Sequence, residues 1–356
     1  MRIRRSSIVF GAVGIVLIAA AAVVRFAIVP VATRLPASTD LVIHYAGKAT
    51  LLNPAALASG DTAKVLQSGV PITLDRRTRV LSTHGNTAIV SDAITVHAGS
   101  TTLPNTHVYA VNRSNLEATR PPNGQKVEPA SGLTVTFPIG PKANNSYRYY
   151  DATTERTVPV AYKGSSSSGG RGTHDYAITA AGPVKDKNLL STLPASLPKK
   201  TLASLAPLLP ANLRAALTPA LSTLPDPVPL TYTASTAITA QADKTTGIAI
   251  NESINETVTV QVAVGGRTVS LVPVLAINAS VTPDSIHYLA GKAKSAARLL
   301  FLVKTLAPLV LLILGLVAVV VAILRRKPAT PEDPGSAQQT GANAATGPAD
   351  RSQEVG

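Results

Sequence analysis

The 356-residue chain has no cysteine, no tryptophan and a single methionine, and aromatic residues make up only 4% of it. Without cysteine there is no disulfide framework, no thiolate nucleophile and no cysteine-based metal site. An exported domain of this chain must therefore be stabilised by core packing alone. The scarcity of aromatic side chains also argues against a surface that stacks nucleic acid bases.

Acidic residues are few, with 19 Asp and Glu against 33 Lys and Arg. Nine of the basic residues lie near the chain ends, and between residues 34 and 298 the 24 basic and 15 acidic residues are spread without a dense run. A nucleic acid groove needs a basic stripe and usually stacking platforms. We therefore expect no nucleic acid partner and interpret the charge as a solvated basic surface near a membrane.

Recognisable catalytic and metal-binding motifs are missing as well. None of the six histidines stands in an H-E-x-x-H or H-x-H arrangement, and there is no phosphate loop or dinucleotide fingerprint. Ser196 and Lys199 match the S-x-x-K pattern of serine acylases, but the companion motifs are absent and Pro198 favours a turn. We expect no enzymatic activity, no catalytic residue, no metal site and no cofactor.

Two long apolar runs dominate the chain: IVFGAVGIVLIAAAAVV at 8–24 and APLVLLILGLVAVVVAIL at 307–324. A membrane-spanning helix needs about 20 mostly apolar residues. We therefore predict transmembrane helices at 7–30 and 305–324. The alternative for the first run is a cleaved signal peptide. We favour an uncleaved anchor because the run is longer than a usual signal core and no clean A-x-A site follows it.

Basic clusters adjoin both apolar runs: Arg2, Arg4 and Arg5 before the first, and Arg325, Arg326 and Lys327 after the second. Basic residues favour the cytoplasmic side. We predict a plasma membrane protein with both termini cytoplasmic and the main domain extracytoplasmic. Residues 1–6 then form a short cytoplasmic N-terminus. Residues 325–356 hold almost no large apolar side chains, which predicts a disordered cytoplasmic tail.

The region from 34 to 281 has the pattern of a β-rich extracytoplasmic domain. Valines alternate with other residues over 257–264, Gly265-Gly266 follows, and alternation resumes at Val269, which predicts a hairpin. Pro273 indicates an edge or a bulge in the second strand. Further strands are expected at 41–47, 78–84, 87–99, 107–113, 133–139, 157–163, 174–180, 230–241 and 246–253. We predict a mainly β fold, an antiparallel curled sheet or meander.

A leucine- and proline-rich helical insert is predicted at 187–226. Its leucines recur every three or four residues, as on one face of a helix: Leu202, Leu205, Leu209, Leu213 and Leu217. Pro207, Pro210 and Pro219 divide this stretch into short helices, with Pro210 opening one of them. One interpretation is that the apolar face caps the β core. The other is that it forms the face that contacts a hydrophobic ligand or a partner.

A juxtamembrane helix is predicted at 282–304. Thr282 is a suitable N-cap, Pro283 suits the first turn, and Asp284 favours the helix dipole. The helical pattern continues without a strong break into the second span. Lys292, Lys294 and Arg298 then lie beside the expected outer headgroups. We interpret them as candidate contacts to membrane lipids, with a solvated helix face as the alternative.

Two segments carry a resemblance to a known family: FPIGPKANNSYRYYDATTERTVPVAYKG at 137–164 and TGIAINESINETVTV at 246–260. Together with a span near each end and a β-rich domain between them, the chain resembles the actinobacterial Porin PorA family, long carried as a domain of unknown function. That resemblance implies a pore in the cell envelope. The two-span layout is also similar to the class B scavenger-receptor architecture, which implies a lipid tunnel through the outer domain.

These observations lead to one favoured function and two alternatives. We expect a membrane-anchored cell-envelope protein that binds or conducts a hydrophobic envelope ligand, a lipid, through its outer domain. One alternative is a subunit of an oligomeric envelope pore. The other is a non-transporting structural or interaction domain. The expected partners are membrane lipids and, for a pore, further copies of the same chain.

Overall fold

The structure is a computed structural model, and it describes residues 5–325. The chain forms two compact units. The helix-pair unit comprises the chain up to Ala22 and from Leu309 onward, and the sheet unit comprises Val23–Pro308. Most of the two predicted cytoplasmic ends, residues 1–4 and 326–356, lies outside the described residues.

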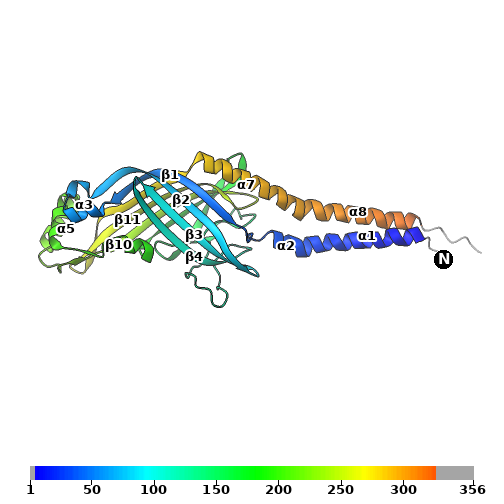
Figure 1. Cartoon of the computed structure of the whole chain (residues 1–356), viewed down its shortest axis with the longest axis horizontal. Helices are drawn as coiled ribbons and strands as arrows, with labels where there is room; N and C mark the ends of the chain where they lie inside the picture. The colour runs from blue at the N-terminus through cyan, green and yellow to red at the C-terminus, as the bar shows by residue number, and fades with distance from the viewer. Residues whose placement is uncertain (1–4, 326–356) are drawn as a thin grey trace, which may run out of the picture. The chain divides into compact units, whose positions relative to one another are not determined.

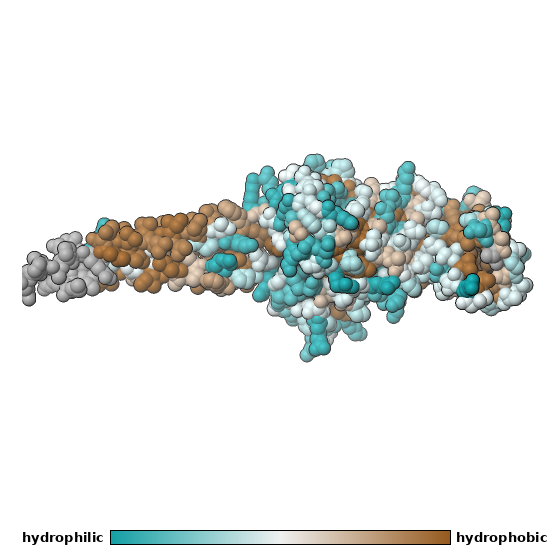
Figure 2. Space-filling model, turned by 180° about the vertical axis from the view of Figure 1, so that it is seen from behind, coloured by the Kyte–Doolittle hydropathy of each residue, from teal (hydrophilic) through white to brown (hydrophobic). Residues whose placement is uncertain are grey.

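Two continuous helices, Ser6–Ala32 with 27 residues and Pro283–Leu324 with 42, are long and apolar enough to cross a membrane. Their segments are α1 (Arg5–Val23), η1 (Val24–Ile28), α2 (Val29–Ala32), α7 (Pro283–Phe301), η4 (Leu302–Leu306) and α8 (Ala307–Leu324). Figure 2 shows hydrophobic residues covering the visible faces of α1 and α8. This length and composition are consistent with a membrane location.

Small residues bring α1 and α8 close together inside the helix-pair unit. A Cβ atom added to Gly14 would lie 2.8 Å from the carbonyl oxygen of Gly315, and one added to Gly315 would lie 2.9 Å from that of Gly14. The hydroxyl of Ser7 donates a hydrogen bond to the carbonyl of Ala322. Glycine is needed at this crossing because a side chain on either helix would force the backbones apart.

The sheet unit is built on one ten-stranded sheet with the order β4-β3-β2-β1-β12-β11-β10-β7-β6-β5 (Figure 1). Its strands are β1 (Asp40–Leu52), β2 (Leu66–His84), β3 (Thr87–Ala98), β4 (Thr101–Asn112), β5 (Arg148–Asp151), β6 (Arg156–Ser168), β7 (Arg171–Pro183), β10 (Thr231–Asp243), β11 (Ala249–Val264) and β12 (Arg267–Val281). All neighbours pair antiparallel. The predicted fold class, a curled antiparallel sheet with two flanking apolar helices, is confirmed.

The two edge strands, β4 and β5, are connected by short bridges from the segment between them. Val111 on β4 pairs with Ala118, Glu117 pairs with Leu133, and Leu133 pairs with Tyr149 on β5. The backbone N–H groups of Asn112 and Leu133 donate at 2.8 Å to the carbonyls of Glu117 and Arg148. Because these bridges link both edges, the sheet curls and encloses an interior.

The prediction of a strand at 133–139 is wrong. Leu133, Thr134, Val135, Phe137 and Pro138 are all buried, so burial does not alternate along this segment. A strand in a two-faced sheet places every second side chain on the other face. Here the segment lies inside the curled sheet, and its interior position buries consecutive residues.

The predicted hairpin at 257–275 is confirmed as β11 and β12. Gly265 and Gly266 connect the strands with φ angles of 55° and 77°, a left-handed conformation that glycine adopts without steric penalty. Pro273 pairs with Thr259 between two register shifts. Proline has no N–H to donate to the ladder, so the strand accommodates it in the predicted bulge.

Short helical and extended segments form the insert between β7 and β10, as its prolines predict. They are α4 (Lys187–Ser191), β8 (Ser196–Leu197), α5 (Lys199–Leu205), η3 (Ala206–Leu208), α6 (Ala211–Ala220) and β9 (Val228–Pro229). Pro210 is the N-cap of α6. Two further short helices, α3 (Pro54–Ser59) and η2 (Thr62–Lys64), connect β1 to β2.

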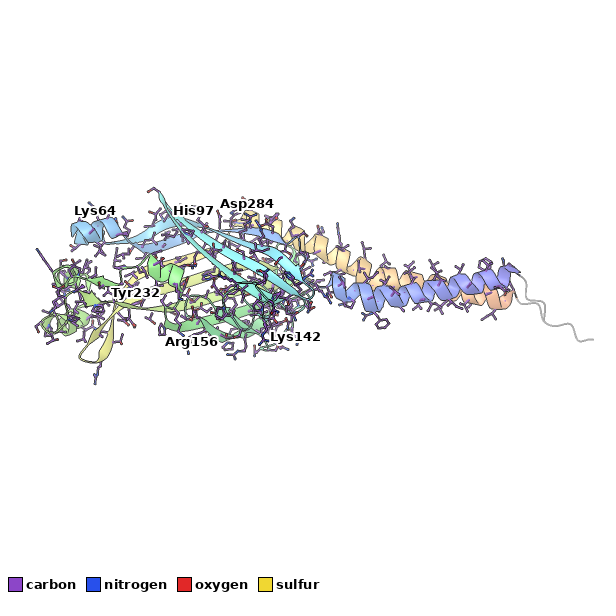
Figure 3. All side chains as sticks on the ribbon, turned by 60° about the horizontal axis from the view of Figure 1, so that its bottom comes forward. Lys64, His97, Lys142, Arg156, Tyr232 and Asp284 are labelled. Carbon is purple, nitrogen blue, oxygen red and sulfur yellow. The ribbon has the colours of Figure 1, made fainter. Side chains whose placement is uncertain are left out.

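The helix α7 begins as predicted at Thr282, whose side chain accepts a hydrogen bond from the Ser285 N–H. Pro283 and Asp284 follow in the first turn (Asp284 is labelled in Figure 3). Ala290 and Ala293 are buried against Ile250 of β11. These small side chains allow α7 to pack closely against the sheet.

Candidate functional site

A cavity of about 610 Å³ lies inside the curled sheet, bounded by β1, β2, β3, β4, β5, β10, β11, β12 and α4. Ligand pockets in proteins usually measure about 300–1,000 Å³. One part of its wall is apolar and includes Val70, Ile94, Val96, Leu189, Leu193 and Leu275. Another part is polar and charged. We call the part with the charged side chains the polar end, and the rest, which also includes uncharged polar residues such as Asn53 and Gln67, the apolar end.

The length of the cavity follows from two lining residues on one strand. Gln67 and Arg76 both line the cavity from β2. An extended strand rises about 3.3 Å per residue, and β2 leaves the extended conformation at Gly69, where φ is 69°, so the two residues lie at most roughly 30 Å apart. One leaflet of a bilayer has a hydrocarbon thickness of about 15 Å. The cavity is therefore long enough for an acyl chain together with a head group.

A buried ion-pair cluster forms the centre of the polar end. Arg76 donates from Nε and Nη2 to the two carboxylate oxygens of Asp92 at 3.0 and 2.9 Å, and from Nη1 to Glu252 at 3.4 Å. The three side chains are only 7%, 9% and 8% exposed. Burial alone lowers the pKa of Arg76, but the two carboxylates outweigh it and raise the pKa, so the guanidinium stays charged.

The carboxyl groups of Glu252 and Glu256 lie on the same face of β11 and both line the cavity. Burial raises the pKa of each above the ordinary glutamate value. Arg76 opposes this shift at Glu252. At Glu256, the hydroxyl of Thr153 opposes it by donating a hydrogen bond of 2.6 Å. Burial of both carboxyl groups therefore favours the protonated form relative to an exposed glutamate.

Two buried hydroxyls complete the polar end. Thr134 and Thr236 line the cavity and are only 3% and 6% exposed. Neither hydroxyl has a hydrogen-bond partner among residues 5–325. A buried polar group without a partner destabilises a protein by about 1–3 kcal/mol. The two oxygens are themselves fully buried, so they lie behind the wall and do not face the open space of the cavity.

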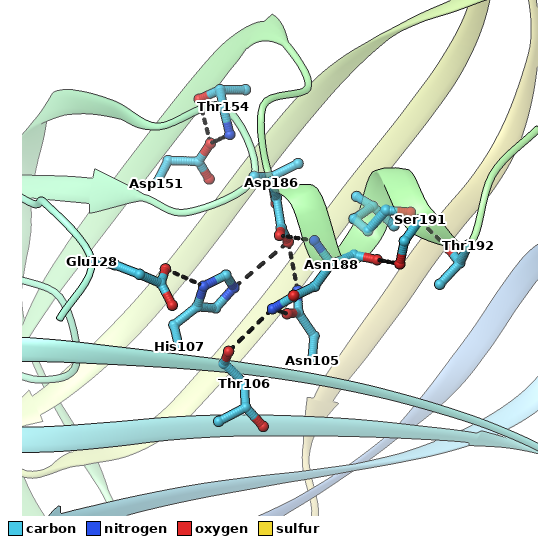
Figure 4. A network of polar contacts seen from close by, with 12 residues as sticks. Asn105, Thr106, His107, Glu128, Asp151, Thr154, Asp186, Asn188, Ser191 and Thr192 are labelled. Carbon is cyan, nitrogen blue, oxygen red and sulfur yellow. Dashed lines mark hydrogen bonds and ion pairs between the residues drawn. The ribbon is translucent and has the colours of Figure 1, made fainter. Parts of the chain in front are cut away.

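His107 on β4 lies at the centre of a second polar network (Figure 4). Its Nδ1 is 2.7 Å from Glu128 and its Nε2 is 3.6 Å from Asp186, while the Asn105 amide donates to Asp186 at 2.6 Å. Burial alone lowers the pKa of His107, but its hydrogen bonds to Asp186 and Glu128 raise it to about 9. The charged imidazolium therefore connects the edge strand β4 to the start of α4.

The predicted leucine face packs against the sheet and does not line the large cavity. Leu202, Leu209 and Leu217 are buried, and Leu205 and Leu213 are half-buried. Leu202 and Leu209 belong to the same hydrophobic core as Tyr232 of β10. The Tyr232 hydroxyl donates a hydrogen bond to the Pro194 carbonyl (Tyr232 is labelled in Figure 3).

A smaller cavity of about 50 Å³ lies beneath α5, and Leu202, Leu205 and Leu209 line it. Leu52 and Val274 line both this cavity and the large one. The insert therefore adjoins the apolar end of the large cavity through these two side chains.

The predicted headgroup contacts Lys292, Lys294 and Arg298 are exposed on α7. The ammonium group of Lys292 lies 5.3 Å from the centre of the Tyr288 ring, which is a cation–π contact. Among residues 5–325, no group of three or more histidine, aspartate or glutamate side chains is arranged to hold a metal ion.

The polar residues of the cavity were missed by the sequence-based prediction, although a local signal exists. Arg76 follows Ile72 and Leu74 on the inward face of β2. Asp92 lies between Val90 and Ile94 on β3, and Glu252 lies between Ile250 and Ile254 on β11. A charged residue in phase with an apolar face is uncommon, because an unpaired charge there is costly. A charged residue at one of the alternating positions that are otherwise apolar is therefore the sequence signal for these three residues.

The fold and the cavity define a β-rich protein with an internal two-ended cavity and two candidate membrane-spanning helices. The family model described as Porin PorA matches residues 6–324, so the chain belongs to the Porin PorA family. This confirms the resemblance found in the sequence and supports a porin-like protein of the cell envelope.

Comparison with individual proteins adds little to the family match. A search of curated proteins finds no match to this chain. One solved structure, a conserved protein of unknown function with a hot dog fold from Alicyclobacillus acidocaldarius, aligns at 13% identity over 70% of this chain and 81% of that one. The TM-score is 0.11, which does not indicate a shared fold.

Proposed function

We propose that this chain is a membrane-anchored cell-envelope protein whose sheet unit binds a lipid in the large cavity. The acyl chain lies along the apolar wall near Val96 and Leu193, and the head group lies at the polar end near Arg76 and Glu252. The observation that carries the proposal is the two-ended cavity of about 610 Å³. An amphipathic ligand matches such a wall, because each of its ends meets an environment of its own polarity.

The proposal includes the predicted arrangement in the plasma membrane. Both termini lie in the cytoplasm and the sheet unit lies outside, because basic clusters adjoin the outer ends of both apolar runs. Lys292, Lys294 and Arg298 on α7 then contact lipid headgroups. We propose a binding role without catalysis.

The leucine-rich insert has a place in this function. We propose that α5 and η3 cover the apolar end of the large cavity, since Leu52 and Val274 line both cavities. Leu205 is half-buried and lines the smaller cavity, so it is placed to contact a lipid tail entering from the large one. The insert then has two roles at once: it caps the hydrophobic core and it closes the apolar end of the ligand cavity.

The proposal is tested by filling the cavity. Leu103 lines the cavity from β4, and the larger side chain in Leu103→Trp occupies that space. The matched control is Leu81→Trp on β2, where the leucine is 47% exposed. We expect native mass spectrometry of the full-length chain, released from detergent, to show about one lipid per chain in wild type and Leu81→Trp. Leu103→Trp should lose most of it. Full lipid content in Leu103→Trp contradicts the proposal.

The family description itself favours a second candidate, an oligomeric pore. The close crossing of α1 and α8 at Gly14 and Gly315 leaves no space for water between the two helices of one chain at that level, so a pore requires several copies. Planar bilayer recordings distinguish the two functions. A lipid-binding protein gives no discrete conductance steps, whereas reproducible steps from a ring of fixed subunit number establish the pore.

A further inference from the structure

We propose that the lipid enters the cavity sideways, through a seam between β4 and α4 that is held closed by the contacts of Asn105 with Asp186 and Asn188. We call these three side chains the latch. This inference rests on the proposed lipid-binding function and concerns how the same site is filled and emptied. It follows from three observations: where the cavity reaches the surface, what joins β4 to α4, and where the latch lies along the cavity.

The cavity reaches the surface at its apolar end. At the polar end, every lining residue is buried or half-buried. The exposed lining residues belong to the starts of α3 and β2, the turn between β3 and β4, the first part of β4, and α4: Pro54, Gln67, Gly99, Ser100, Thr101, Pro104, Asn188 and Thr192. The mouth of the cavity is therefore at this end, and β4 and α4 form part of its rim.

Side-chain hydrogen bonds hold β4 to α4. The Asn105 amide donates to the Asp186 carboxylate at 2.6 Å (Figure 4). The Asn188 amide donates to the Asn105 side-chain oxygen at 3.0 Å and to the Thr106 carbonyl at 3.2 Å. Among residues 5–325, no hydrogen bond between backbone groups joins β4 to α4.

The other edge of β4 is joined very differently. There β4 pairs with β3 along its whole length. Two paired strands separate only when a ladder of backbone hydrogen bonds breaks. Parting β4 from α4 breaks the few side-chain bonds of the latch, so the wall opens more readily at this seam than within the sheet.

The latch lies between the mouth and the polar end. Along β4, Thr101 and Pro104 are exposed at the mouth, Asn105 is half-buried in the latch, and His107 is buried at the polar end. Opening the seam therefore lengthens the mouth along β4 from Thr101 to His107, which is roughly 20 Å at 3.3 Å per residue. A lipid entering sideways places its head group at the polar end directly. The head group then avoids crossing the apolar end, which would be costly for a polar group.

The absence of cysteine from the chain allows a direct test, because a thiol cross-link forms only at an introduced pair. In Asn105→Cys/Asn188→Cys, the thiols replace two side chains in contact, and a short methanethiosulfonate cross-linker joins them reversibly. The full-length chain in detergent is loaded with a pyrene-labelled fatty acid before cross-linking, and release is followed after excess unlabelled fatty acid is added. We expect cross-linking to slow release at least about tenfold. Reductant should restore a rate equal to or above that of wild type, because the reduced variant lacks the latch.

The matched control is Thr239→Cys/Ser253→Cys, at a pair whose hydroxyl oxygens are 2.7 Å apart across the β10–β11 ladder. Backbone hydrogen bonds already join these strands, so this cross-link should leave the release rate unchanged. Equal release from the cross-linked and the reduced latch variant overturns the inference.

Asn188→Ala tests the latch without a cross-link. Asn188 is exposed, so the thermal unfolding temperature should hardly change. Release of the reporter should become roughly three- to tenfold faster, because the bonds to Asn105 and Thr106 are lost. The control is Lys187→Ala, at the exposed neighbouring position of α4, which should change neither quantity. Unchanged release from Asn188→Ala contradicts the inference.

The outcomes distinguish this inference from the function on which it rests. If the pyrene-labelled fatty acid does not bind to wild type, lipid binding fails as a function, and the entrance proposed for it fails too. If the fatty acid binds but its release is insensitive to the latch cross-link, lipid binding stands and only the entrance is wrong.

Discussion

The inner and outer faces of β2 show how the same residue type takes on different roles. Arg76 and Arg77 are consecutive, so their side chains point to opposite faces of the sheet. Arg77 pairs with Asp40 on the outer face, where the two side chains are 51% and 41% exposed. Arg76 pairs with Asp92 and Glu252 inside. An exposed pair is solvated and contributes little, whereas a buried cluster must stay complete.

The strongest test of this contrast removes each arginine in turn. We expect Arg76→Leu to lower the free energy of unfolding by about 3–5 kcal/mol, because Asp92 and Glu252 are left buried without their cation. Arg77→Leu should change stability little, since water solvates Asp40. Urea unfolding of the full chain followed by circular dichroism measures both. Equal effects of the two variants would show that the inner cluster is solvated.

The insert offers the same contrast between two consecutive leucines. Leu209 is 5% exposed and packs in the core, whereas Leu208 is 40% exposed. We expect Leu209→Ala to destabilise the protein by about 2–5 kcal/mol, through lost burial and the cavity left behind. Leu208→Ala should have a much smaller effect. Thermal unfolding of the two variants compares them, and a stable Leu209→Ala would show that the insert does not support the core.

A smaller effect is expected from the pH dependence of the His107 network. The pKa of His107 is raised to about 9 from the ordinary value of 6.5, so its protonated form is favoured in the folded state. Its stabilising contribution is therefore complete below about pH 6.5 and is lost as the pH rises through about 9.

The measurement is the thermal unfolding temperature of wild type and His107→Gln between pH 6 and pH 9.5. Wild type should lose stability relative to the variant over this range. His84→Gln is the control, because His84 is exposed, and it should keep the wild-type profile. Parallel profiles for wild type and His107→Gln would show that the network does not contribute through the charged imidazole.

Much of the local structure could be predicted from the sequence. Alternating valines with Gly265-Gly266 predicted the β11–β12 hairpin, Thr282 predicted the start of α7, and Pro210 predicted the start of α6. Each of these signals acts over a few residues, through backbone sterics or a single hydrogen bond. The segment 133–139 was misjudged because its interior position buries neighbouring side chains without alternation.

The candidate site was less predictable, because its residues are far apart in the chain. Arg76 and Glu252 are 176 positions apart, and β2 and β11 are separated in the sheet by β1 and β12. They meet because the sheet curls, which no local pattern encodes. The leucine face was visible in the sequence as a helical repeat, whereas the charged residues on the inward strand faces stand singly in their strands and were not singled out.

The sequence by itself determined the two apolar helices, the β-rich character of the region between them and the proline-divided insert. These features follow from hydrophobic periodicity and from the steric properties of proline and glycine. The tertiary structure alone decided which strand faces enclose a cavity and which charges meet there. Curling of the sheet turns one face of each strand into an interior wall, where burial makes every charge depend on a partner from a distant strand.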